Sequence, residues 1–199
     1  MSSTSPSKPA SPSLHRPRTL TERPLDILYL AYFGIHLLAS LAIDAQLTYP
    51  PYSQTLFPEP LRNVLRDYLT SSKDPFLLAA ERASAEHVWF RVLLASETLF
   101  QIPCFAVAIW GLIHDEKRTY PLMVCYGTLA ASSTLQCICS VLFGADGRSL
   151  TKAQIAGLLQ NYVPFCIIPT LLTFDMMLRI VGLLAPPTTA EKKVDGKDE

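Results

Sequence analysis

Four apolar stretches, each long enough to cross a lipid bilayer, dominate this 199-residue sequence. They extend over residues 25–47, 87–113, 120–143 and 155–184, and a membrane-spanning helix needs about 20 mainly apolar residues. Inside a bilayer the backbone has no water to bond with, so such a segment forms a helix that satisfies its own N–H and C=O groups. We therefore predict an all-α fold, an integral membrane bundle of four helices.

The ends of the chain are polar and lie outside these stretches. Residues 1–23 are rich in Ser, Pro and Thr and carry several arginines, a composition typical of disorder. Prolines at positions 6, 9, 12 and 17 oppose the amphipathic helix of a mitochondrial presequence, which is the alternative interpretation. The sequence thus predicts a disordered basic tail over 1–23, a membrane domain over 24–184 and a polar tail over 185–199.

Charge and cysteine usage exclude several classes of protein. The formal net charge is zero, whereas nucleic-acid binding needs a basic surface. No glycine-rich phosphate loop, zinc-ligand cluster or serine nucleophile motif is present, so we predict no metal, no cofactor and no nucleic-acid partner. All five cysteines lie in apolar stretches, where we interpret them as packing residues: Cys104, Cys125, Cys137, Cys139 and Cys166.

The distribution of Lys and Arg predicts an orientation. The two tails and the connection between the second and third spans carry nine of these residues, and the other two connections carry six. Because positive flanks favour the cytosol, we predict that both termini are cytosolic and that segment 48–86 lies in a lumen. An even number of spans agrees with this orientation.

Segment 48–86 contains a candidate helix of its own. From Pro60 onward, apolar residues recur at positions 61, 64, 65, 68 and 69, which is the spacing of an amphipathic helix. We predict a short helix that caps the bundle or lies on the membrane surface. An ordinary connecting helix without any ligand contact is the open alternative.

Two carboxylic acids, Asp44 and Glu97, lie inside the first two apolar stretches. An acid in hydrocarbon costs about 2.5–3.5 kcal/mol, so such residues usually face a protein interior, a partner or a wet cavity. We interpret them as a ligand or proton site within the bundle. The alternative is that each acid only bonds a neighbouring helix, because such interhelical bonds are common in membranes.

Polar residues around these acids follow helical spacing. His36, Ser40 and Asp44 are four residues apart, as are Glu97 and Gln101, and residues four apart share a helix face. The two stripes could face each other across a pocket, where burial and proximity would keep a proton on one of the acids. An ammonium ligand could then pair with the other acid, or the pair could do acid–base chemistry. His36 is a further candidate base. The alternative is that His36 makes only a structural hydrogen bond.

Three further charged residues receive only local interpretations. Asp26 stands at the start of the first span, where a helix N-terminus favours an anion, and we assign it no other role. Asp175 and Arg179 are four residues apart, which predicts an ion pair within one helix rather than a site.

An ordered series of motifs resembles a known membrane-protein family over about residues 24–182. The series comprises Arg23-Pro24-Leu25-Asp26, His36, Ile43-Asp44-Ala45-Gln46, Phe57-Pro58, Leu61-Arg62-Asn63, Lys73-Asp74-Pro75-Phe76-Leu77, Trp89-Phe90, Glu97-Thr98-Leu99-Phe100-Gln101-Ile102-Pro103, Tyr162-Val163-Pro164-Phe165 and Ile168-Pro169. It is similar to the EXPERA family, in its sigma-2 receptor branch, which is related to the emopamil-binding sterol isomerase.

The resemblance implies a multi-pass protein of the endoplasmic reticulum membrane with an occluded pocket that opens sideways to lipid. It implies a sterol, oxysterol or cationic amphiphile as ligand, a homodimer, and a cholesterol-transport membrane protein as possible partner. Glu97 would pair with a ligand ammonium while Asp44 holds it through a shared proton. The implied ligand-binding residues are Asp44, Glu97, Gln101, His36, Tyr162 and Phe165, with Asp74 and Thr98 in support. Phe165 departs from the receptor, which has a tyrosine there.

Three functions stay open. The first is a binding protein with a role in sterol homeostasis or transport, which we favour over catalysis because the sequence follows the receptor more closely than the isomerase. The second is an enzyme like the sterol Δ8–Δ7 isomerase, with the acidic pair moving protons. The third is a membrane factor that assists the targeting of mitochondrial precursors.

Overall fold

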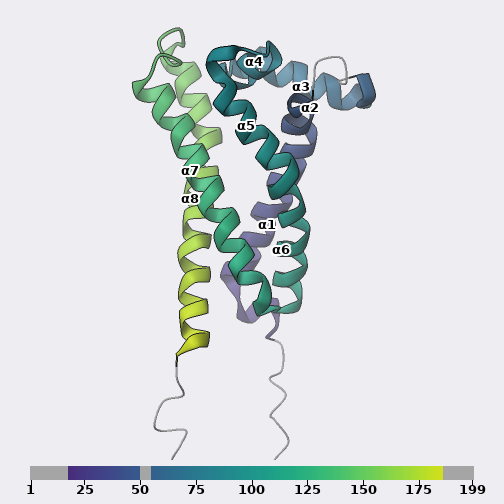
Figure 1. Cartoon of the computed structure of the whole chain (residues 1–199), viewed down its shortest axis with the longest axis vertical. Helices are drawn as coiled ribbons and strands as arrows, with labels where there is room; N and C mark the ends of the chain where they lie inside the picture. The colour runs from purple at the N-terminus through teal and green to yellow at the C-terminus, as the bar shows by residue number, and fades with distance from the viewer. Residues whose placement is uncertain (1–17, 50–54, 186–199) are drawn as a thin grey trace, which may run out of the picture.

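The computed structural model describes residues 18–49 and 55–185, and these residues form helices joined by short connections (Figure 1). Helices long and apolar enough to cross a membrane occur at Pro24–Thr48, Ala85–His114, Lys117–Phe143 and Lys152–Leu184. Each of these boundaries lies within one helical turn of the predicted one. The prediction of an all-α, multi-pass protein with four candidate spans is therefore confirmed.

The first two spans are built alike, each from α-helices separated by a π-helical turn. The first span contains α1 (Pro24–Ala39), a π turn (Ser40–Asp44) and α2 (Ala45–Thr48). The second span contains a 3-10 turn (Ala85–His87), α5 (Val88–Ser96), a π turn (Glu97–Gln101) and α6 (Ile102–His114). Isolated π turns within α-helices are often found at functional sites.

The third and fourth spans are continuous helices, α7 (Tyr120–Phe143) and α8 (Lys152–Leu184), which run side by side in Figure 1. A close approach at Gly127 brings them together, since a Cβ atom there would lie 2.8 Å from the carbonyl oxygen of Pro169. Thr151 and Gln154 form a capping box at the start of α8. The small residue at this crossing permits the backbone contact typical of membrane helices.

Two short helices cross the end of the bundle where the first span finishes and the second begins (Figure 1). They are α3 (Glu59–Ser72) and α4 (Pro75–Glu81). The structure confirms the amphipathic helix predicted after Pro60, because Leu65 and Leu69 on its apolar face are buried. These helices cap the bundle.

The buried apolar side chains form two clusters at different levels of the bundle. One joins α1, α6, α7 and α8 around Phe33, Phe105 and Tyr126. The other joins α2, α3, α4, α5, α7 and α8 around Phe76 and Leu158. The two acids of the π turns lie between these clusters.

Part of the predicted disordered tail is ordered. Residues 18–23 contain a 3-10 turn, Leu20–Glu22, and the side chain of Arg23 is only 3% exposed. Its guanidinium donates to the carbonyl oxygen of Leu112 at 2.9 Å. Residues 18–23 of the predicted tail are therefore ordered, because buried partners on a distant span hold this arginine. The rest of the predicted tail, 1–17, and residues 186–199 lie outside the described residues.

A buried ion cluster holds the span ends together, and the interpretation of Asp26 as a purely local residue is wrong. The Asp26 carboxylate is fully buried and pairs with Arg23 at 2.5 Å and with Arg179 of α8 at 2.7 Å. Arg179 also makes the predicted intrahelical pair with Asp175 at 2.7 Å. The cluster thus connects α1 with α8, which the spacing of Asp175 and Arg179 alone could not reveal.

Asp115 extends this cluster to the connection after α6. It lies within 3.5 Å of Arg18 and of Arg23. Burial alone would raise the pKa of Asp115, but the hydrogen bonds and charges of Arg18 and Arg23 outweigh it and hold this pKa below its ordinary value. The start of the first span is therefore fixed against the end of the second.

Candidate functional site

A cavity of about 350 Å³ lies among the spans, beneath α3 and α4. Its wall includes Ile35 of α1 and Asn161 of α8, both of which are also exposed on the outside, so the cavity opens between these two helices. Most of the remaining wall is apolar. The cavity brings together all six residues that were predicted to bind ligand: Asp44, Glu97, Gln101, His36, Tyr162 and Phe165.

The two acids occupy the facing π turns rather than regular helix. A π turn contains one more residue than an α turn, yet Ser40 and Asp44, four residues apart, both still lie toward Glu97 on the second span. Ser40 is fully buried, and its hydroxyl donates a hydrogen bond to Glu97 on the other span. Hydrophobicity patterns do not distinguish a π turn from an α turn, which is why the sequence did not indicate it.

A threonine pair holds the two π-turn segments at a fixed distance. The hydroxyl groups of Thr48 and Thr98 lie 2.7 Å apart, and Thr48 also donates to the carbonyl oxygen of Asp44 at 3.1 Å. Thr98 was predicted as a supporting residue. It does not line the cavity, and its contact with Thr48 lies between the two acid-bearing spans.

Asp44 and Glu97 line the same cavity from the two π turns. A direct hydrogen bond between two carboxyl groups requires a proton on one of them. Glu97 also accepts from Ser40, and the Nε2 atom of His36 lies 3.4 Å from Glu97. Glu97 is thus surrounded by more donors than Asp44.

His36 is held from the side opposite the cavity. Its Nδ1 atom lies 2.8 Å from the hydroxyl of Tyr126 and 3.1 Å from that of Tyr32. Its ring packs against Phe105 and, edge on, against Phe165, with centroid separations of 4.9 and 4.7 Å. The structural hydrogen bond considered for His36 is therefore present, and the same side chain also reaches Glu97.

The sequence gives only part of this arrangement. Tyr32 precedes His36 by four residues, and that spacing could have identified it as a partner. Tyr126 comes from the third span, and nothing in the local sequence connects it with His36.

Asp74 supports the cavity from α4. It is fully buried and caps this helix by accepting from the N–H groups of Phe76 and Leu77 at 3.0 and 3.2 Å. It also accepts a hydrogen bond from the hydroxyl of Tyr162 on α8. Burial raises the pKa of Asp74, and these hydrogen bonds offset the rise only in part. The contact positions the ring of Tyr162 at the cavity wall.

Tyr68 of α3 lies at the same wall. Asn161 of α8 donates to its hydroxyl at 3.2 Å. Burial, together with the nearby Asp74, raises the pKa of Tyr68 to about 12. The phenol therefore stays neutral in the physiological range and links α3 to α8 beside the cavity opening.

Gln101 contributes a polar group to an otherwise apolar part of the cavity. Its side chain is 4% exposed, and its Oε1 atom accepts no hydrogen bond from the described residues. A buried acceptor without a donor is costly, so this atom favours a ligand that carries an O–H or N–H group. Within the described residues, no three His, Cys, Asp or Glu side chains are grouped as a metal site.

Comparison with known proteins places the chain in a family. The family model described as EBP: EXPERA (EXPanded EBP superfamily) matches residues 60–176. Sigma intracellular receptor 2 of Xenopus tropicalis is 25% identical, with 78% of this chain and 89% of the relative covered. The human protein of the same name is 26% identical, with 79% and 89% covered.

A fungal relative is similarly distant. The Efficient mitochondria targeting-associated protein 19 of Schizosaccharomyces pombe is 28% identical, with 79% of this chain and 77% of the relative covered. The family model covers more than half of the chain, and several motifs of the resemblance contribute residues to the cavity wall, among them His36, Asp44, Asp74, Glu97 and Tyr162. The chain is thus a multi-pass membrane protein that belongs to the EXPERA family and is distantly related to sigma intracellular receptor 2.

Proposed function

We propose that this protein binds sterols and cationic amphiphiles in the cavity between its spans, and that it serves sterol homeostasis or transport. The observation that carries the proposal is the pair of carboxyl groups, Asp44 and Glu97, in a largely apolar cavity of about 350 Å³. This volume falls within the range of small-molecule sites, which are mainly apolar with a few placed polar groups.

The geometry supports separate roles for the two acids. Glu97 is the ion partner of a ligand ammonium, because Ser40 and His36 already stabilise a negative charge on it. Asp44 stays protonated, and its O–H group donates a hydrogen bond to Glu97. The Oε1 atom of Gln101 accepts from a sterol hydroxyl or from the ammonium, and Phe165 with Tyr162 packs against the hydrocarbon skeleton.

The proposed setting is the endoplasmic reticulum membrane, with both termini in the cytosol. The excess of Lys and Arg in the tails and in the second connection supports this orientation. The relatives named sigma intracellular receptor 2 support an intracellular membrane. A homodimer, contact with membrane lipid and a cholesterol-transport membrane protein as partner belong to the same proposal.

Two alternative functions have their own support. A carboxyl pair that shares a proton could carry out the acid–base steps of a sterol Δ8–Δ7 isomerase. The relative from Schizosaccharomyces pombe is named for mitochondrial targeting, which supports a factor that assists the targeting of mitochondrial precursors. Complementation of cells that lack sterol isomerase tests the first alternative, since only an active enzyme restores their sterol profile.

The decisive experiment compares Glu97→Gln with Glu86→Gln, which makes the same chemical change on an exposed residue outside the cavity. Loss of one partner of a buried charge pair costs about 2–5 kcal/mol. Glu97→Gln should therefore weaken binding of a cationic amphiphile at least about 30-fold, with a much smaller effect on a neutral sterol. Equal affinities of both variants for the amphiphile would refute the proposal.

A further inference from the structure

A second cavity, of about 490 Å³, lies at the end of the bundle where α4 meets the connection between α7 and α8 (Figure 1). The short helix α4 separates it from the first cavity. Asp74 and Leu77 face the first cavity, whereas Lys73 and Leu78 line the second. The two cavities therefore share a wall and no lining residue.

The second cavity carries positive charge. Lys73 and Arg82, which flank α4, both line it, and its described lining contains no Asp or Glu. Neither cation makes an ion pair with any carboxylate in residues 18–49 and 55–185. The cavity thus presents two cations that no carboxylate neutralises, which is the arrangement expected for an anion.

His87 adds a fixed polar group to this lining. Its Nε2 atom bonds Asp146 at 2.8 Å, and Asp146 is itself held by the hydroxyl of Ser140 at 2.5 Å. The Nδ1 atom of His87 is buried and has no hydrogen-bond partner among the described residues. Since an imidazolium donates from both nitrogens, an anion in this cavity would give Nδ1 the partner that it lacks.

The first turn of α8 borders the same cavity. Gln154 of this turn and Ser149 just before it line the cavity, opposite Ser84. The N-terminus of a long helix carries a partial positive charge and favours anions. The hydroxyl groups of Ser84 and Ser149, the side-chain amide of Gln154 and the two cations therefore line one space.

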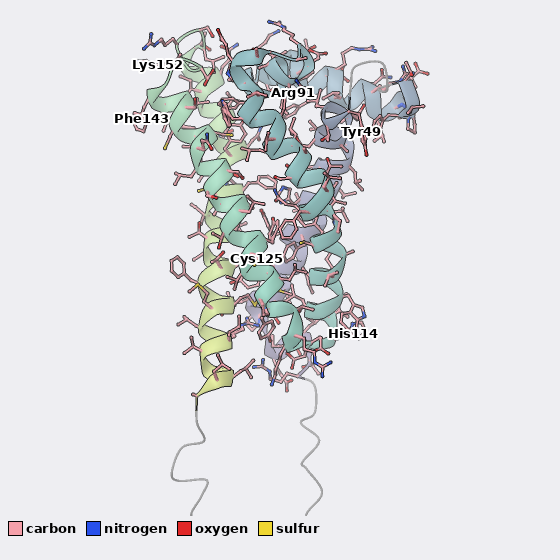
Figure 2. All side chains as sticks on the ribbon, viewed as in Figure 1. Tyr49, Arg91, His114, Cys125, Phe143 and Lys152 are labelled. Carbon is pink, nitrogen blue, oxygen red and sulfur yellow. The ribbon has the colours of Figure 1, made fainter. Side chains whose placement is uncertain are left out.

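The position of this cavity indicates the kind of anion. It lies where the second span starts, the third ends and the fourth starts, which is the level of lipid headgroups. Phe143 and Lys152 lie at this end of the bundle (Figure 2), and the Phe143 side chain is 81% exposed. An acyl chain could pack against such a side chain while its headgroup occupies the cavity.

We propose that the second cavity binds a phosphate group, with Lys73 and Arg82 as its charge partners. The group comes either from the headgroup of an anionic phospholipid or from a free phosphate ester, and the location favours the lipid. This site is separate from the amphiphile cavity and does not depend on the function proposed for it.

The test uses the full chain, purified in detergent, and measures binding of phosphatidic acid, phosphatidylcholine and glycerol phosphate by thermal shift and native mass spectrometry. The variant Lys73→Gln with Arg82→Gln is compared with Arg148→Gln with Lys152→Gln. The control pair removes two cations at the same end of the bundle that do not line the cavity.

Each cation near an anionic headgroup contributes a factor of about five, so we expect roughly 30-fold weaker binding of phosphatidic acid in the cavity variant and little change in the control. Binding of glycerol phosphate with the same pattern would identify a free phosphate ester as the ligand. Equal losses in both variants, equal binding of phosphatidylcholine, or no binding of any probe would overturn the proposal. Glu97→Gln should leave phosphatidic acid binding unchanged, which separates this result from the amphiphile test.

Discussion

Removing the carboxylate of Asp26 should destabilise the bundle more than any change in an exposed ion pair. Asp26 is completely buried and joins Arg23 and Arg179 at 2.5 and 2.7 Å. Breaking a buried pair by removing one partner costs about 3–5 kcal/mol, because the remaining charge is left uncompensated. Arg23 and Arg179 each retain a second carboxylate, Asp115 and Asp175, so we expect the lower part of this range for Asp26→Ala.

The assay is thermal unfolding of the purified protein in detergent. For a chain of this size about 3 kcal/mol corresponds to a decrease in Tm of roughly 6–12 °C. Arg118→Ala is the control, because the Arg118 side chain is 94% exposed and its contact with Glu116 is 4.0 Å. An exposed pair of this kind contributes about 0–1 kcal/mol.

A double variant separates the ion cluster from simple loss of packing. Asp26→Leu combined with Arg179→Met replaces the interhelical pair with apolar side chains, and such replacements are often neutral. The Tm of the double variant should therefore lie above the value expected if the two single effects were added. Additive losses, or an Asp26→Ala variant as stable as Arg118→Ala, would refute the argument that this cluster joins α1 to α8.

The remaining predictions concern α4 and the contact between α7 and α8. Asp74→Asn should keep the helix cap, whereas Asp74→Ala should lose it and leave Tyr162 unpaired, at a cost of about 2–4 kcal/mol in thermal unfolding. Burial raises the pKa of Asp74 in the folded protein above its unfolded value of about 3.9. The protonated Asp74 side chain therefore contributes fully to stability below a pH of about 3.9, and this contribution is lost as pH rises through the folded pKa. Asp74→Asn should remove this pH dependence of stability. The same dependence of Tm on pH in Asp74→Asn and in the unchanged protein would contradict the role assigned to Asp74. Gly127→Ala should cost about 1–3 kcal/mol, since the Pro169 carbonyl blocks a Cβ atom. Gly157→Ala, with open space around it, should be neutral or stabilising, and equal Tm values for the two glycine variants would contradict this account.

The two acids show how far local sequence reaches into the site. Asp44 and Glu97 could be selected from the sequence because a charge in an apolar stretch is costly and needs a reason. Their approach across two π turns could not be predicted, since a single additional residue in a turn leaves the hydrophobic pattern almost unchanged. The contacts of Glu97 with Ser40 and His36 depend on this approach of the two spans.

The amino-acid sequence by itself determined the four spans, the amphipathic α3 and the identity of the acids. These features depend on local composition and periodicity, which the hydrophobic effect translates directly into helices and faces. Tertiary structure alone decided that Asp26 meets Arg179, that Tyr126 meets His36 and that Tyr162 meets Asp74. Each of these contacts joins residues about 90 positions or more apart, and no local pattern specifies which distant polar group will satisfy a buried one.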